Sequence, residues 1–116
     1  MIQERVPNRS VAVIDQPINV WAALLQRMDI LICNNSGPMH IAAAVGTPTI
    51  SFMGPTQYPR WKPWGEGHII VRKNIPCIGC NNGFCRIKTH ECMQRIEVSE
   101  VMQHLEQAWK KVQHHE

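Results

Sequence analysis

Two short apolar runs, separated by a turn and a small apolar segment, constrain the fold of this chain more than any other feature. The first run is Ile30–Cys33 and the second lies at residues 48–53. The segment between them, Met39–Val45, is rich in alanine, which predicts a short buried helix. A strand, a helix and a second strand joined by short links form the parallel unit of an α/β fold. Because Ile30–Cys33 is apolar throughout, we expect a strand that is buried on both faces.

The flanking segments extend this pattern in both directions. Val11–Ile14 predicts a preceding strand, and apolar residues three and four apart within Ile18–Met28 predict the helix that follows it. Beyond the second run, His68–Val71 predicts a further short strand, and Val98–Val112 predicts a final amphipathic helix. We therefore expect an α/β domain of three layers with a mostly parallel sheet.

The composition limits the number of domains and the class of partner. A chain of 116 residues with 44% hydrophobic residues has room for one folded domain. Its net charge of +3 comes without a basic cluster, so we do not expect nucleic acid as a partner. No apolar stretch approaches the ~18 residues of a transmembrane helix, and the first residues do not resemble a secretion signal. These features predict a cytoplasmic protein.

The polar turn between the first apolar run and its helix, Asn34–His40, is the first candidate site. Ser36 or Gly37 can begin the helix, and Pro38 fits the first turn, where a missing N–H costs nothing. Ligands of parallel sheets bind beyond the carboxyl ends of the strands, so the backbone N–H groups of this turn can face an anion, with His40 within reach. The alternative, which the spacing alone favours, is a helix cap without a ligand, with His40 simply near the surface.

A cluster of cysteines is the second candidate site. Cys77, Cys80, Cys85 and Cys92 fall within one short segment, and four thiolates suit a closed, tetrahedral zinc site. His90 is a substitute fourth ligand. The alternative is a set of reduced thiols that pack a loop, because only the first pair has a standard zinc spacing. A bound metal would hold the loop in place and would not catalyse, since four protein ligands leave no open position.

The four tryptophans divide into two groups. Trp21 and Trp109 lie on the apolar stripes of two predicted helices, so we expect both in the core. Trp61 and Trp64 flank a Lys-Pro pair. They can stack on a sugar or an adenine, but we favour the commoner role of covering the hydrophobic edge of the sheet.

The order and spacing of four motifs are similar to those of a known family. The motifs are Leu31–Ala44, Gly46–Pro48, Phe52–Thr56 and Arg60–Gly65. Together they resemble glycosyltransferase family 9, the ADP-heptose:lipopolysaccharide heptosyltransferases. The resemblance extends over about residues 11–109, and the cysteine cluster looks like one found in many members.

The resemblance implies a GT-B architecture of two Rossmann-like domains, with this chain similar to the later part of the C-terminal, donor-binding domain. The implied donor-binding residues are Asn35, Ser36, Gly37, Pro38, Met39, His40, Gly54 and Thr56. The family usually has Asp where this chain has Asn35, placed to hydrogen-bond the donor sugar. Asparagine keeps the shape and one acceptor but loses the charge.

The resemblance also implies what this segment does not supply. In the family, the N-terminal domain provides the acceptor site and the carboxylate that acts as general base, so we assign no catalytic residue here. We expect residues 1–10 to form a tail or the remnant of a preceding strand, residues 11–113 to form part of the donor domain with a cysteine-rich loop at 75–93, and residues 114–116 to form a second tail. The chain is then either a fragment of a longer enzyme or a truncated product that cannot catalyse transfer.

Two functional hypotheses follow. In the first, the chain is part of a glycosyltransferase that binds ADP-heptose for transfer to the inner core of lipopolysaccharide, without a catalytic cofactor, and zinc has at most a structural role. In the second, it is a truncated, non-catalytic module that binds a nucleotide or is stabilised by a metal. The first hypothesis places the full enzyme in the cytoplasm, at the inner face of the inner membrane. A relative that uses another nucleotide sugar is a further alternative.

Overall fold

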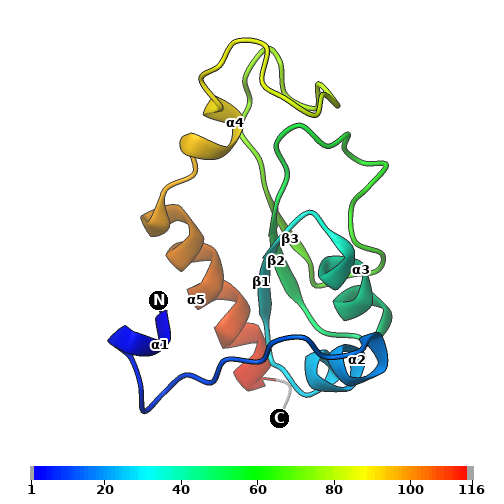
Figure 1. Cartoon of the computed structure of the whole chain (residues 1–116), viewed down its shortest axis with the longest axis vertical. Coiled ribbons are helices and arrows are strands. Elements are labelled where there is room, and N and C mark those ends of the chain that lie inside the picture. The colour runs from blue at the N-terminus through cyan, green and yellow to red at the C-terminus, as the bar shows by residue number, and fades with distance from the viewer. Residues whose placement is uncertain (1, 115–116) are drawn as a thin grey trace.

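The computed structural model describes residues 2–114 and shows a small parallel sheet with helices on both sides (Figure 1). The strands are β1 (Leu31–Asn34), β2 (Thr49–Phe52) and β3 (Ile69–Val71), hydrogen-bonded in the order β1-β2-β3. Both strand pairs are parallel, with Leu31 opposite Thr49 and Ile50 opposite Ile69. The helices are α1 (Ile2–Arg5), α2 (Ile18–Gln26), α3 (Gly37–Ala44), α4 (Glu91–Gln94) and α5 (Val98–His114).

Three layers result from this arrangement. Helix α3 packs on β1 and β2, α2 packs against α3, and α5 contacts β2. In Figure 1 the sheet lies between α5 on one side and the α2–α3 pair on the other. The predicted α/β architecture with a parallel sheet is therefore confirmed.

The core lies around the central strand. Ile50 of β2 and Met39 of α3 have no exposed surface, and Leu25 brings α2 into the same core. Thr47, in the link between α3 and β2, is buried and donates a hydrogen bond to the carbonyl oxygen of Leu25 at 2.6 Å. This bond satisfies a buried hydroxyl and joins the start of β2 to the end of α2.

The strand expected at Val11–Ile14 does not form, because no strand within residues 2–114 lies beside it to pair with. The segment is unpaired, and the side chain of Val11 is 85% exposed. The expectation that the first apolar run is buried on both faces is also wrong. Strand β1 lies at the edge of the sheet, and Ile32 is 44% exposed. Apolar composition alone does not distinguish an edge strand from a central one.

The last helix differs from its prediction in burial. Helix α5 begins at the expected residue but has no buried residue, and Trp109 is 45% exposed. The main contact of the helix with the sheet is to the short strand β2, so its apolar stripe is only partly covered: Val101, Leu105, Ala108 and Val112 are half-buried, and Val98, Met102 and Trp109 are exposed. Residue 1 of the expected N-terminal tail and residues 115–116 of the C-terminal one lie outside the described residues, whereas His114 ends α5. Within residues 2–114, no helix combines the length and hydropathy needed to cross a bilayer.

Candidate functional site

The turn between β1 and α3 presents an open helix N-terminus. Ser36 is the N-cap residue and has an extended backbone, but its hydroxyl donates to the carbonyl oxygen of Asn34, at 3.4 Å, and makes no cap hydrogen bond. A Cβ built on Gly37 would meet no atom within 4 Å, and the backbone there is not left-handed. The first turn of α3 therefore faces unfilled space at the carboxyl edge of the sheet, although Pro38 has no N–H and the N–H of Met39 donates to the carbonyl oxygen of Ser36 at 3.1 Å.

Asn35 connects this turn to a loop far along the chain. Its side-chain nitrogen donates a hydrogen bond of 2.8 Å to the carbonyl oxygen of Trp61, and it also lies 3.5 Å from the sulfur of Met39. The amide nitrogen is thus used inside the protein, and the amide oxygen is the part of this side chain that can accept a hydrogen bond from a ligand. A carboxylate at this position has no hydrogen to donate to Trp61.

The loop that Asn35 holds carries cations and exposed rings. The guanidinium of Arg60 lies 5.3 Å from the ring centroid of Trp61. Arg60, Lys62 and Trp64 line a depression of about 200 Å³. The expectation that Trp61 and Trp64 cover the edge of the sheet is wrong, because Trp61 is 45% exposed and Trp64 is 85% exposed. The exposed ring of Trp64 can stack on a ligand, whereas one face of Trp61 already lies against Arg60.

The other predicted donor residues lie on the loop after β2. Strands β1 and β2 end side by side, with Asn34 opposite Phe52, so the two predicted loops start at the same edge of the sheet. Gly54, however, packs against the cysteine-rich segment: its built Cβ would lie 2.9 Å from the sulfur of Met93 and 3.0 Å from that of Cys92. Sequence reasoning did not find this contact, and no local motif signals it.

The cysteine-rich segment is bound to the same loop. The backbone N–H of Gly79 donates to the carbonyl oxygen of Gly54 at 3.1 Å, and that of Asn81 donates to Pro55 at 2.6 Å. These two hydrogen bonds hold the strand end and the cysteine-rich loop together. Two of the other predicted donor residues are half-buried: His40 lies in α3, and Thr56 follows Pro55 in the loop after β2.

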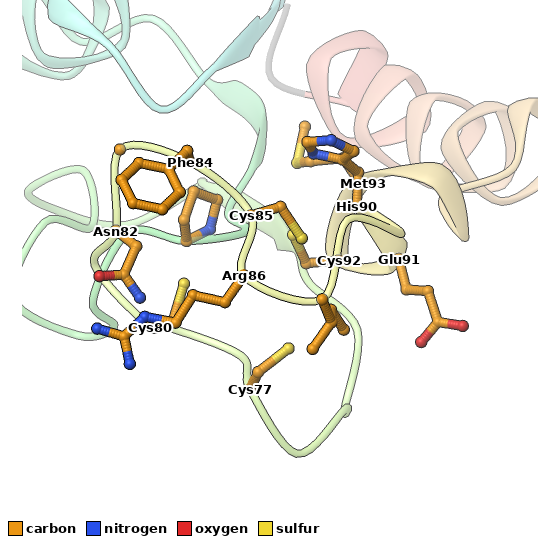
Figure 2. Close-up of a pocket in the computed structure, with 13 residues that line it drawn as sticks. Cys77, Cys80, Asn82, Phe84, Cys85, Arg86, His90, Glu91, Cys92 and Met93 are labelled. Atoms are coloured by element: carbon orange, nitrogen blue, oxygen red, sulfur yellow. The ribbon is translucent and has the colours of Figure 1, made fainter.

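All four clustered cysteines line one cavity of about 530 Å³ (Figure 2). They do not converge as a zinc site would require, since no group of three or more His, Cys, Asp or Glu side chains among residues 2–114 is placed to hold a metal ion. The predicted structural zinc is therefore unsupported. The cysteines are free thiols, with Cys77 and Cys80 exposed and Cys85 and Cys92 half-buried.

The thiols of this cavity differ in acidity. Backbone N–H hydrogen bonds, that of His90 foremost, lower the pKa of the Cys85 thiol below its ordinary value of 9.0. Burial raises the pKa of Cys92, and the nearby thiols of Cys77, Cys80 and Cys85 raise it further by charge repulsion. The fifth cysteine, Cys33 of β1, is not part of the cavity, and burial raises its pKa to about 11.

Comparison with known proteins supports the resemblance noted in the sequence. The family model for glycosyltransferase family 9 (heptosyltransferase) matches residues 17–90. Lipooligosaccharide heptosyltransferase 2 of Campylobacter jejuni is 33% identical over 76 residues, which are 65% of this chain and 24% of that protein. Lipopolysaccharide heptosyltransferase 3 of Escherichia coli is 45% identical over 47 residues, 40% of this chain and 14% of that protein. The chain thus spans a quarter or less of these relatives, and no solved structure matches it significantly.

Proposed function

Because this chain belongs to glycosyltransferase family 9, the heptosyltransferases of lipopolysaccharide core synthesis, we propose that it binds the nucleotide-sugar donor, ADP-heptose, for transfer to the inner core. The relatives are named for heptosyl transfer to lipooligosaccharide or lipopolysaccharide, which fits a sugar donor and a lipid-linked acceptor. The proposal places the reaction in the cytoplasm, at the inner face of the inner membrane.

The observation that carries this proposal is the open N-terminus of α3. A diphosphate carries the charge that a helix N-terminus favours, and backbone N–H groups are its natural donors. The bare backbone at Gly37 lets a phosphate oxygen come close, since no protein atom occupies the space in front of it. The predicted donor residues Asn35, Ser36, Pro38, Met39 and His40 surround this point in the sequence.

The loop held by Asn35 supplies the second half of the proposed site. Arg60 and Lys62 bring two positive charges to a loop whose main chain is hydrogen-bonded to the turn before α3. In glycosyl transfer, negative charge develops on the departing diphosphate, and fixed donors and cations stabilise that charge. The chemical step also needs a base that takes the proton of the acceptor hydroxyl, and we assign that role to no described residue.

Binding of ADP to a Gly37→Val variant tests the proposal. A valine side chain fits the unfilled space and the backbone conformation, so the fold should survive, while the phosphate loses its approach. We expect the affinity for ADP, measured by calorimetry, to fall at least tenfold, or about 1.4 kcal/mol.

Gly83→Val is the matched control. Gly83 also has open space around its built Cβ, but it lies in the cysteine-rich loop, so its substitution should leave ADP affinity unchanged. If both variants bind ADP as tightly as the original chain, the turn is only a helix cap. If the original chain does not bind ADP at all, the proposed donor-binding function is refuted for this chain.

A further inference from the structure

The cysteine-rich loop forms one end of the molecule and presents apolar and basic side chains there. In Figure 1 this loop lies at the top of the long axis, and the C-terminal end of α5 lies at the bottom. All residues from 86 to 90 are exposed. Phe84 is 77% exposed and Ile87 is 53% exposed. Scattered apolar residues are normal on a protein surface, but two of them between cations on one protruding loop suggest a binding surface.

A tight turn presents these side chains to the outside. The N–H of Lys88 donates to the carbonyl oxygen of Cys85 at 3.3 Å, so Arg86 and Ile87 are the two central residues of the turn. The base of the loop is fixed by its two hydrogen bonds to the loop after β2. Residues 84–88, which we call the loop tip, thus combine an aromatic ring, a guanidinium, an aliphatic side chain and an ammonium group.

The charge of the loop tip is positive and has no acidic neighbour within the loop. Residues 74–90 contain Arg86 and Lys88 and no Asp or Glu. Neither cation has an ion-pair partner within residues 2–114. Glu91 is the next acidic residue along the chain, but Figure 2 shows its carboxylate and the Arg86 guanidinium on opposite sides of the cavity. Both cations are therefore available to an anionic partner.

We propose that the loop tip docks on a membrane surface that is rich in anionic lipid. Phe84 and Ile87 enter the boundary between the headgroups and the acyl chains, and Arg86 and Lys88 bind the lipid phosphates. Long basic side chains suit this position, because their charged ends reach the headgroups while their stems lie against apolar surface. The inference rests on the proposed function for the choice of membrane, but it does not depend on any contact with the nucleotide.

The small size of the loop tip favours a bilayer over another macromolecule. A stable protein interface takes about 800 Å² from each partner, more than these five residues can supply. Nucleic acid is usually bound by a larger cluster of Lys and Arg than this pair. A bilayer needs only a few anchors, and each Lys or Arg near an anionic surface strengthens binding about fivefold. We therefore expect weak, reversible binding that salt reduces.

Co-sedimentation with lipid vesicles tests the proposal, with a reductant present and without nucleotide. We expect the chain to bind vesicles of phosphatidylcholine and phosphatidylglycerol in equal parts at least about tenfold more tightly than vesicles of phosphatidylcholine alone. Arg86→Gln and Lys88→Gln should each weaken binding to the mixed vesicles about fivefold. Phe84→Ser should weaken it by at least about fivefold through lost apolar burial. Because all three side chains are exposed, the variants should keep the circular dichroism spectrum of the original chain.

The opposite end of the molecule supplies a matched control. Trp109 of α5 is 45% exposed and is followed by Lys110 and Lys111, so this end also combines a ring with two cations. Trp109→Ser and the double variant Lys110→Gln/Lys111→Gln should leave vesicle binding unchanged. The proposal is overturned if these variants lose binding while the variants of the loop tip keep it. A chain that binds neither kind of vesicle, or both equally, also overturns it.

A fluorescence measurement tests whether the ring at position 84 enters the bilayer. In the Phe84→Trp variant, lipids brominated on their acyl chains should quench more of the tryptophan fluorescence than in the original chain. Bound protein without this additional quenching overturns the insertion of the loop tip. A chain that binds vesicles but not ADP contradicts the donor-binding function alone, and a chain that binds ADP but not vesicles contradicts this inference alone.

Discussion

Gly54→Ala tests how tightly the loop after β2 is packed against α4. A Cβ at this position would lie 2.9 Å from the sulfur of Met93, 3.0 Å from the sulfur of Cys92 and 3.2 Å from Cγ of Met93. Ordinary contacts between non-bonded carbon atoms are about 3.5–4.0 Å, so the added methyl group overlaps its neighbours by roughly half an ångström or more. Gly54 does not have a positive φ, so the cost comes from this overlap and not from backbone strain.

The two neighbours can give way to different degrees. The Met93 side chain is long and can move aside. The Cys92 sulfur is attached directly to its Cβ on a short helix, so it moves only by a change of χ1 rotamer or with the backbone of α4. Overpacking of this kind costs about 1–3 kcal/mol. We take about 2 kcal/mol, which for a domain of this size lowers Tm by roughly 8 °C.

Differential scanning calorimetry under reducing conditions measures the effect. Gly83→Ala is the control, because its Cβ would meet nothing within 4 Å, and it should change Tm by little. In a Cys92→Ala background the cost of Gly54→Ala should fall by about half, since the stiffer of the two neighbours is gone. The packing argument is refuted if Gly54→Ala is no more destabilising than Gly83→Ala.

Two further predictions concern the hydrogen bond from Asn35 to Trp61 and the contact of the half-buried His68 with Thr49. In the Asn35→Asp variant, residue 35 cannot donate to the carbonyl oxygen of Trp61 and places a negative charge against it. Trypsin should therefore cut after Arg60 several times faster than in the original chain. An unchanged cleavage rate would mean that this hydrogen bond does not hold the loop. Burial lowers the pKa of His68, whose ring nitrogen lies 3.0 Å from the hydroxyl of Thr49. His68 therefore binds a proton more readily in the unfolded chain than in the folded one. Its contribution to folding stability is complete above the ordinary pKa of 6.5 and is lost as pH falls below that value. His68→Gln should flatten the urea stability profile between pH 7 and 5, and a parallel decline in both proteins would contradict this.

The elements predicted best are those whose pattern is local. The segments around residues 30–33, 39–45 and 48–53 became β1, α3 and β2 because a strand, a capped turn and a small apolar helix follow one another without interruption. Val11–Ile14 has an equally apolar pattern and failed, since a strand exists only where another strand pairs with it. The sequence contains no information on that partner.

The candidate site was predicted in outline and missed in its connections. The turn before α3 lies where the motif placed it, but the hydrogen bond from Asn35 to Trp61 spans 26 residues and has no sequence signal. The cysteine-rich loop has left-handed backbone at Lys88 and His90, which no local motif signals, and spacing suggested a zinc site there. The spacing of cysteines in a sequence indicates which thiols lie near one another, but not whether their sulfurs point at one common metal position.

The position of β1 at the margin of the sheet has a practical consequence for anyone who prepares this polypeptide. Its outer side carries backbone donors and acceptors without a neighbouring strand, and Leu31–Asn34 contains neither a charged residue nor a proline to discourage a second strand. Ile32, whose side chain is 44% exposed, adds an apolar contact surface to this edge of the sheet. We expect β1 strands of two molecules to pair edge to edge and cause aggregation. Aggregation, more than unfolding, should then limit the yield, the storage life and the usable concentration of the protein.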